Sequence, residues 1–414
     1  MSRTEIQAGL KTSRPSQSTA QPAAAAAPSP PARGPAGLRL GFRPFYLAAA
    51  LLACVEVPLW VAFNLGALDL PSTLPPMLWH AHEMLFGFAA AVIVGFLLTA
   101  GKAWTGRSTP HGASLGALVL LWAAARLTTF GAPYAVHAAL DIALLPLVAA
   151  VLGRVLLQAG NRRNLVLVLL LALLTTANVV FHLAVAGVLA ISALTPLHAA
   201  LALVVMIECV IAGRIVPAFT QSVTPGLKLR ASAALDGATL AATAVALLLW
   251  VFAAPGWPGA LAFGVAGALH LRRQAGWHPW ATRRRPILWI LHAGYAWIAI
   301  GCGLLALAQL GLVGCSAGIH ALAVGATGGL VIGMITRTAR GHTGRPLQAS
   351  RSEVLAYALV LLAAGLRVVW PLMPAALQPI VLVAAATCWS VAFLVYLIVF
   401  APWLTAPRLD GKDG

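Results

Sequence analysis

The sequence predicts an all-α protein that crosses a membrane about twelve times. Hydrophobic residues make up 60% of its 414 residues and charged residues only 9%, whereas charged residues make up about a quarter of a typical soluble protein. The apolar residues form stretches of about 20 residues, the length that a helix needs to cross a bilayer. Basic residues occur in every second loop between these stretches, as is typical of multi-pass membrane proteins.

Twelve stretches are long enough to be membrane-crossing helices. They are residues 46–65, 79–100, 113–131, 134–157, 164–186, 192–216, 231–253, 257–272, 286–309, 313–337, 353–371 and 375–403. Residues 1–38 are rich in Ala, Pro, Ser and Gln and have no apolar core, so we expect a disordered cytoplasmic tail. The transmembrane domain then covers residues 39–405, and residues 406–414 form a cytoplasmic C-terminal tail.

The basic residues also predict the orientation of the chain. Lys and Arg occur in the N-terminal segment and in alternate loops, and the intervening loops contain none. Because such loops stay on the cytoplasmic side, both termini are predicted to be cytoplasmic. These dispersed positions explain the formal net charge of +17, so the charge does not indicate a nucleic-acid partner. The partner that the composition predicts is the lipid bilayer.

Six of the eleven histidines share one depth in this predicted membrane, near the outer face. Imidazole is the commonest metal ligand, and ionisable groups within a bilayer usually mark a functional site. The sequence therefore predicts metal ligands near the outer surface. The first candidates are His80, His82, His198 and His320, followed by His137 and His182.

Helix geometry limits which of these side chains can act together. His80 and His82 are two residues apart and point to different sides of a regular helix. Either one of them precedes the helix, or they serve different centres. His137 and Asp141 are four residues apart and share a face. In this arrangement a carboxylate can orient the second nitrogen of a ligand, although a hydrogen-bonded pair that helps helices to pack has the same spacing.

Further ionisable residues lie within the predicted helices. Glu83 and Asp141 are close to the histidines in sequence, and Glu56 and Glu208 fall near the middle of the bilayer. Such acids are expected to be protonated, paired, or part of a proton route. The basic residues near the outer ends of helices are Arg126 and Arg367. Snorkelling explains their positions, and haem propionates would also be natural partners.

Two segments, residues 82–107 and 320–345, resemble each other. Aligned without gaps, they share a first histidine, two glycines and a final triplet: His82 with His320, Gly87 with Gly325, Gly95 with Gly333, and Thr-Gly-Arg at 105–107 with 343–345. A looser version at His198 suggests that the second, sixth and tenth crossing helices are pseudo-symmetric members of three four-helix units. This arrangement is similar to that of the haem–copper oxidase catalytic subunit.

Several strings of residues resemble the NnrS family. They are Trp-His-Ala-His-Glu-Met-Leu-Phe-Gly-Phe at 79–88, Trp-Thr-Gly-Arg at 104–107, Phe-Arg-Pro-Phe at 42–45, Gly-Arg-Ile-Val-Pro-Ala-Phe-Thr at 213–220 and Gly-His-Thr-Gly-Arg-Pro-Leu at 341–347. The resemblance runs in order from Phe42 to about residue 400. It implies a twelve-helix protein of the bacterial inner membrane that binds haem and copper and acts in the response to, and protection from, nitric oxide.

The resemblance extends to individual residues. His80, His82 and Glu83 match the first string, and Arg214 matches the Gly-Arg string. His320 and His342 match the two histidines of the tenth helix region. One local departure is the pair Lys-Ala at 102–103, where the family often has Pro-Asn.

Three functions fit these observations. The first is a haem- and copper-binding protein that binds nitric oxide or a related small molecule. The second is an oxidase-like enzyme that metabolises nitric oxide, although the adjacent His-His pair and the His-Pro-Glu string of haem–copper oxidases are absent from the sequence. The third is a transporter that uses the intramembrane acids. We expect the first, and the sequence leaves open whether the protein catalyses a reaction and which histidines bind haem or copper.

Overall fold

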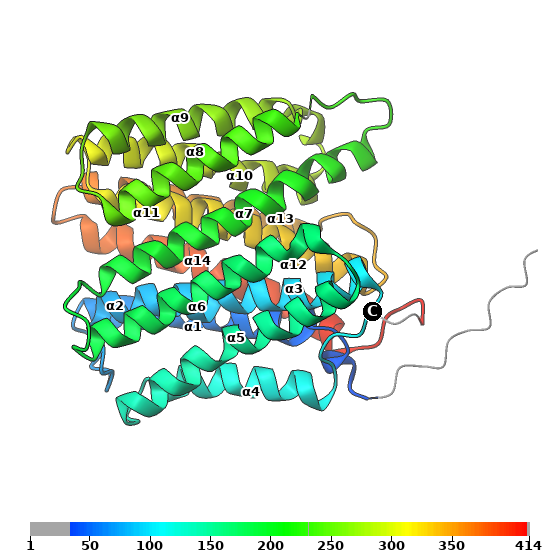
Figure 1. Cartoon of the computed structure of the whole chain (residues 1–414), viewed down its shortest axis with the longest axis horizontal. Coiled ribbons are helices and arrows are strands. Elements are labelled where there is room, and N and C mark those ends of the chain that lie inside the picture. Colours follow the sequence, from blue (N-terminus) through cyan, green and yellow to red (C-terminus); the bar gives the residue numbers. More distant parts are fainter. Residues whose placement is uncertain (1–33, 231, 412–414) are drawn as a thin grey trace, which may run out of the picture. The chain divides into compact units, whose positions relative to one another are not determined.

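Helices form in every apolar stretch that the sequence indicates (Figure 1). The computed structural model describes residues 34–230 and 232–411. Within these ranges the β-type pairing is confined to an isolated bridge between Ser72 and Phe130, so the all-α prediction is confirmed. Of the expected N-terminal tail, residues 1–33 lie outside the described ranges, and Ala36–Leu38 form a short 3₁₀ turn, η1.

The helix ends differ from the predicted ends by a few residues. The helices are α1 (Phe42–Asn64), α2 (Pro76–His82), α3 (Ala90–Thr105), α4 (Ala113–Thr128), α5 (Tyr134–Gln158), α6 (Leu165–Val185), α7 (Leu194–Val223), α8 (Ala233–Phe252), α9 (Trp257–Ala275), α10 (Pro286–Gln309), α11 (Cys315–His320), α12 (Gly329–His342), α13 (Arg351–Val369) and α14 (Gln378–Thr405). Short 3₁₀ segments are η3 (Arg162–Asn164), η4 (Pro279–Thr282) and η6 (Trp370–Leu372). Two π-helical segments, η2 (Glu83–Ala89) and η5 (Ala321–Gly328), join α2 to α3 and α11 to α12.

Ten helical segments of the described chain are long and apolar enough to cross a membrane, so the protein is a multi-pass membrane protein. The helices α4 and α9 are not among the ten. Helix α4 has 16 residues, about 24 Å of helix, and α9 carries His270 and two arginines near its end. Both helices still expose large apolar side chains, since Leu120 is 71% and Leu261 69% exposed. Exposed apolar faces of this kind are expected where a helix contacts lipid.

Contacts between distant parts of the chain bring the two π-helical segments to the same central helix. Helix α7 contacts both η2 and η5, and α10 packs against η5 and α9. Helix α1 packs against α3 and α14. Arg43 is fully buried at the start of α1 and donates to the carbonyl oxygens of Leu404 and Ala406 at 2.9 and 2.8 Å. The beginning and the end of the helical domain are thereby joined.

The sequence similarity between residues 82–107 and 320–345 extends to the backbone. His82 is the last residue of α2, and the π-helical segment η2 begins at the next residue. His320 is likewise the last residue of α11, and η5 begins at the next residue. Helices of the π type are rare and occur frequently at functional sites. The two segments are therefore related in conformation as well as in sequence.

Glycines on the second of these segments let α10 approach closely. A Cβ atom added at Gly325 would lie 2.4 Å from the ring of Trp297, and one at Gly329 would lie 2.8 Å from the Cα atom of Gly294. Small residues at a spacing of four commonly allow such close helix packing in membranes. The glycine face of η5 and α12 is thus occupied by α10.

Candidate metal centre

Three of the six predicted histidines meet between α2, α5 and α6. His82 ends α2, His137 and Asp141 lie on α5, and His182 lies on α6. The ring centroid of His82 is 6.1 Å from that of His137 and 5.3 Å from that of His182, and the last two are 5.5 Å apart. All three side chains are buried, with exposed fractions of 3% or less. We call His82, His137, Asp141 and His182 the metal centre.

Each imidazole of the metal centre is held through its Nδ1 atom. The partners are a carboxyl oxygen of Glu83 for His82 (3.5 Å), the carbonyl oxygen of Ala125 for His137 (3.1 Å) and the hydroxyl of Tyr134 for His182 (2.8 Å). Oxygen partners of this kind fix the ring orientation of a metal-binding histidine and leave the other nitrogen as the ligand. Phe181 also stacks on the His82 ring at a centroid distance of 4.7 Å.

The Nε2 atoms of His82 and His182 share Asp141 as a neighbour. One carboxylate oxygen, Oδ2, lies 3.1 Å from Nε2 of His82 and 3.1 Å from Nε2 of His182, and it accepts a hydrogen bond of 2.7 Å from the Asn178 amide. Nε2 of His137 is buried and has no hydrogen-bond partner in the described chain. Ligand atoms of His82, Asp141 and His182 lie within 4.8 Å of one another, so these three residues could hold a metal ion. His137 is not one of the three, but its ring lies beside them.

The charges around the metal centre favour a cation. Arg126 of α4 donates to Oε2 of Glu83 at 3.0 Å and also pairs with Oδ1 of Asp141. When the imidazoles are neutral and the carboxyls ionised, two carboxylates face a single guanidinium. Unbalanced charge is costly in a buried place, and a bound cation would offset it. Gly87 makes room for this pair, since a Cβ there would lie 2.9 Å from Arg126 Nη1.

A small cavity of about 10 Å³ adjoins the metal centre. Its polar lining comes from the side chains of Asp141, Arg126 and Asn178, and its apolar lining from Phe86, Trp122, Ala125, Leu144 and Leu145. A cavity of this size accommodates about one water-sized molecule. The metal centre therefore has an adjacent space for a very small ligand.

His80 faces away from the metal centre, although it lies on the same helix as His82. Its Nδ1 atom is 3.0 Å from Oε1 of Glu56, and its ring stacks on Trp60 at a centroid distance of 4.1 Å. Both His80 and His82 lie within α2. Of the two alternatives that the sequence leaves open, the structure therefore shows the second, in which the two histidines serve different places.

His320 ends α11 and makes its hydrogen bonds outside the metal centre. Nδ1 of His320 lies 2.7 Å from the Ser316 carbonyl oxygen, and Nε2 accepts a 3.0 Å hydrogen bond from Arg367. Arg367 also lies over the ring of Trp370, and its Nη1 atom is buried without a partner in the described ranges. We call Glu56, Trp60, His80, His320 and Arg367 the second cluster.

His198 belongs to neither group. Its ring stacks on Trp250 of α8, with a centroid distance of 4.6 Å. Glu208, also on α7, has a buried Oε2 atom for which the described chain offers no hydrogen-bond partner. The six histidines thus divide into three in the metal centre, two in the second cluster and one beside Trp250.

Two predicted relations look different in three dimensions. His137 and Asp141 share a face of α5, but the hydrogen bond of His137 goes to the carbonyl of Ala125, whereas Asp141 contacts histidines from α2 and α6. Arg126 is buried in ion pairs, so it does not snorkel towards the membrane surface. The two acids nearest to the histidines in sequence, Glu83 and Asp141, do both contact them.

Sequence reasoning missed Tyr134 and Asn178. Their spacing contains the signal, because Asn178 precedes His182 by four residues and Tyr134 precedes His137 by three, so each lies on the same helix face as a histidine. The spacing places each residue on the correct helix face but does not identify its partner, because Tyr134 bonds to His182 and Asn178 to Asp141 and His82. Neither is charged, and a search for ionisable groups therefore passes over both.

Comparison with protein families gives a match over most of the chain. A family model described as NnrS protein matches residues 36–408, which is most of the chain and includes every residue of the metal centre and the second cluster. A search among curated proteins finds no match.

Proposed function

Because the chain belongs to the NnrS family of membrane proteins that act in the response to nitric oxide, we propose that it binds copper and haem in the bacterial inner membrane and protects against nitrosative stress. The observation that carries the proposal is the metal centre, where three buried imidazoles are held through Nδ1 and one Nε2 atom lacks a partner. The family accounts for the biological setting, and the geometry supports the metal.

The residues of the metal centre fit copper. Copper accepts imidazole ligands readily, and His82, His137 and His182 would hold it, with Asp141 as a further ligand or as the group that orients two of the rings. When bound, copper supplies a redox-active ion that takes nitric oxide as a ligand. The protein keeps the imidazoles in place through Glu83, Ala125 and Tyr134, as described above.

The residue types of the second cluster fit haem, although iron would have to replace the hydrogen bond that Nε2 of His320 accepts from Arg367. Haem iron takes one or two axial histidines, and His80 and His320 come from different crossing helices. Nδ1 of each is held by an oxygen, from Glu56 and Ser316 respectively. Nη1 of Arg367 has no hydrogen-bond acceptor in the described chain, and a haem propionate would supply one.

The small cavity supports nitric oxide, or a molecule of similar size, as the partner. Its walls are largely apolar, and Asp141 links it to the metal centre. A neutral diatomic molecule needs little polar contact and little space. Arg126 and Asn178 add hydrogen-bond donors at one side of the cavity, so a bound molecule would meet both an apolar wall and polar groups.

One observation favours the alternative of an oxidase-like enzyme that metabolises nitric oxide. Helix α7 contacts both π-helical segments, so the second, sixth and tenth crossing stretches meet as the sequence similarity suggests. His198 of α7, however, stacks on Trp250 instead of joining another histidine. Production of nitrous oxide by the purified protein, supplied with an electron donor and nitric oxide, would establish the enzyme.

The orientation is also part of the proposal. We place the metal centre near the outer surface, and the basic loops and both termini in the cytoplasm, because basic loops are retained on that side. Helices α2 and α11 begin at one end of the bundle, the left in Figure 1, and the described chain ends at the other. Fusions of a reporter that is active only in the cytoplasm, placed after residue 411 and in the loop between α8 and α9, would test this orientation.

The test of the proposed cofactors is metal analysis and an absorption spectrum of the detergent-purified protein. His82→Ala and His182→Ala should lose copper and keep haem, whereas His80→Ala and His320→Ala should lose haem and keep copper. His111→Ala is the matched control, because His111 lies in the loop before α4, and it should keep both. Full retention of both cofactors in all four variants would reject the assignment.

A further inference from the structure

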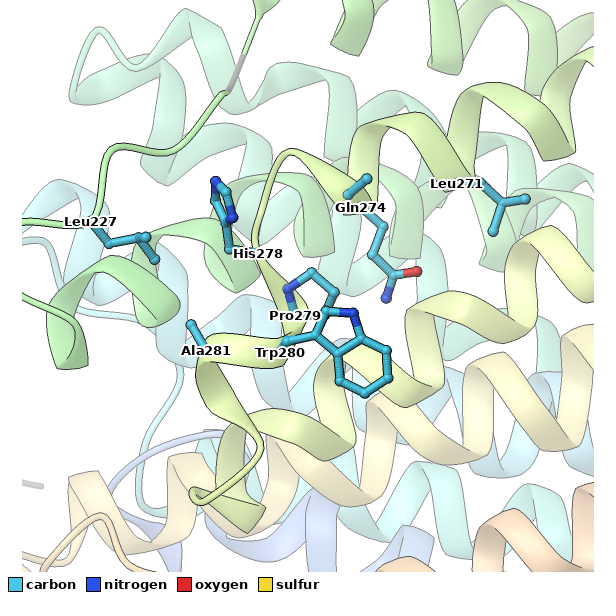
Figure 2. A pocket seen from close by; sticks show the side chains of 8 residues that line it. Leu227, Leu271, Gln274, His278, Pro279, Trp280 and Ala281 are labelled. Carbon is cyan, nitrogen blue, oxygen red and sulfur yellow. The ribbon is translucent and has the colours of Figure 1, made fainter.

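An open pocket of about 340 Å³ lies at the end of α9, where the chain turns into α10 (Figure 2). The pocket is lined by Leu227, Leu271, Gln274, Ala275, His278, Pro279, Trp280 and Ala281. Leu227 belongs to the loop between α7 and α8, and the other residues belong to α9 and the turn that follows it. None of these residues is part of the metal centre or the second cluster.

Specific contacts hold the walls of this pocket together. The amide of Arg230 donates to the carbonyl oxygen of Gly276 at 3.0 Å, which ties the α7–α8 loop to the turn after α9. A Cβ atom at Gly276 would lie 2.8 Å from the Arg230 carbonyl oxygen, so this close approach requires glycine. Gln274 donates to the His292 carbonyl oxygen at 2.5 Å and anchors one wall to α10. The pocket is therefore preformed.

The turn after α9 presents a tryptophan to the surroundings. His278 has a φ of 53°, in the left-handed region that non-glycine residues rarely adopt. It lies between Trp277, which is 1% exposed, and Trp280, which is 80% exposed. Exposed tryptophans near the ends of membrane-crossing helices are typical of the interface between lipid and water. Leu271, on the last turns of α9, is 57% exposed and adds an apolar surface beside it.

Exposed basic residues flank the pocket-lining residues in the sequence, and no ion pair of the described chain neutralises them. The exposed side chains are Lys228, Arg230, Arg272, Arg283, Arg284 and Arg285. Between residues 224 and 285 the sequence contains one acid, Asp236. Asp236 already pairs with the buried Arg273 at 2.7 Å. The pocket thus has a mixed, partly apolar lining, and the exposed basic residues next to that lining in the sequence are what we call its basic rim.

We propose that this pocket binds an anionic phospholipid of the cytoplasmic leaflet. The basic rim fits the phosphate, because clusters of Lys and Arg beside membrane helices attract anionic headgroups. Leu271 and Trp280 fit the glycerol and the start of an acyl chain. A free phosphate would use the rim alone, whereas the apolar lining favours a lipid. The choice of leaflet rests on the proposed orientation, and the proposal does not depend on copper or haem.

Thermal unfolding of the purified full-length protein tests this site. Phosphatidylglycerol should raise the melting temperature by about 3 °C or more above the effect of phosphatidylcholine, since a ligand that binds only the folded state stabilises it. Inorganic phosphate at the same concentration should have little effect. An equal shift with inorganic phosphate would overturn the lipid assignment and indicate a free phosphate site.

Matched variants locate the effect. The double variant Arg283→Gln/Arg284→Gln should lose most of the extra stabilisation by phosphatidylglycerol. The control Arg162→Gln/Arg163→Gln removes two exposed arginines from the loop between α5 and α6 and should keep it. Equal stabilisation of both double variants would overturn the proposal, because the effect would then come from net charge and not from the pocket.

A second readout does not depend on stability. Brominated phosphatidylglycerol should quench the fluorescence of Trp280, measured as the difference between the wild-type protein and Trp280→Phe. The difference should exceed that obtained with brominated phosphatidylcholine. If the two lipids quench this component equally, the pocket has no preference for the anionic headgroup and the proposal fails.

Discussion

The segments α2–η2–α3 and α11–η5–α12 share a backbone and differ in chemistry. Each has a histidine directly before its π-helical stretch, His82 in one and His320 in the other. The first segment continues with Glu83, where the second has Ala321. One histidine therefore lies among carboxylates, and the other does not. The comparison teaches that the repeated backbone sets the position of a histidine, while the neighbouring side chains decide which groups that histidine meets.

The arginines of the two regions show the same contrast. Arg126, from α4, is neutralised by Glu83 and Asp141. Arg367, from α13, makes no ion pair in the described chain; it donates to His320 and leaves Nη1 unpartnered. The first region thus has an excess of acceptors and suits a cation. The second has an excess of donors and suits a cofactor that carries carboxylates.

The largest expected effect comes from removing a ligand of the first region. His182→Ala should lower the copper affinity on the order of 100-fold or more, because one ligand of the metal is removed. Haem binding should not change. Competition with a copper chelator measures the affinity, and the absorption spectrum measures haem. His278→Ala is the control, because His278 lines the separate pocket at the end of α9 and is not part of the metal centre. Unchanged copper affinity in His182→Ala would place the copper elsewhere.

The carboxylate shared by two rings should matter nearly as much. Asp141→Asn removes one negative charge with little change in shape, and copper affinity should fall about 10- to 100-fold, as for other groups that orient metal ligands. Asp236→Asn is the control. It removes the carboxylate that pairs with the buried Arg273, and it should leave copper binding unchanged. Equal behaviour of the two variants would mean that Asp141 is merely another structural ion pair.

In the second region, Arg367→Gln should weaken haem binding by about 10- to 100-fold, because a hydrogen bond to a charged group is worth about 1.5–3 kcal/mol. Copper content should not change. The matched variant Arg126→Gln should leave haem binding unchanged and alter the copper affinity, because it removes the guanidinium that pairs with Glu83 and Asp141. Haem titration of the purified apoprotein measures haem binding, and metal analysis with chelator competition measures copper. Loss of copper but not haem in Arg367→Gln would contradict the division into two regions.

The two equivalent glycines should give the smallest effects on cofactors. Gly87→Ala places a methyl group 2.9 Å from Arg126 Nη1 and 2.6 Å from Leu52, and copper affinity should fall a few-fold as the arginine shifts. Gly325→Ala instead meets the ring of Trp297 at 2.4 Å, and should cost about 1–3 kcal/mol of stability through overpacking. Melting curves and copper titrations of both variants check this. A copper defect in Gly325→Ala with normal melting would show that the glycines serve another purpose.

The helices were predictable because hydrophobic length is a local property of the sequence. Each apolar stretch forms a helix within a few residues of its predicted ends. Two features were not predictable. Helix α4 is shorter than its stretch of 113–131, and the π-helical turns after His82 and His320 have no simple signature in the residues.

The candidate site could be predicted only in part. Depth along the helices follows from the sequence, and it correctly groups the histidines at one end of their helices. The rotation of each helix about its axis depends on packing with other helices. The sequence alone therefore does not predict that the His82 side chain contacts Asp141 and that the His80 side chain contacts Glu56. The same holds for His198, which has the right depth and stacks on Trp250.

The most direct test of the account is pulsed electron paramagnetic resonance of the copper(II)-loaded protein, which counts coordinated imidazoles through their remote nitrogens. The account predicts three imidazoles in the wild-type protein and two in His137→Ala, the variant that removes the ring whose Nε2 atom has no partner in the described chain. The same number in both proteins, or copper held without imidazole, would contradict the central claim that His82, His137 and His182 together bind the metal.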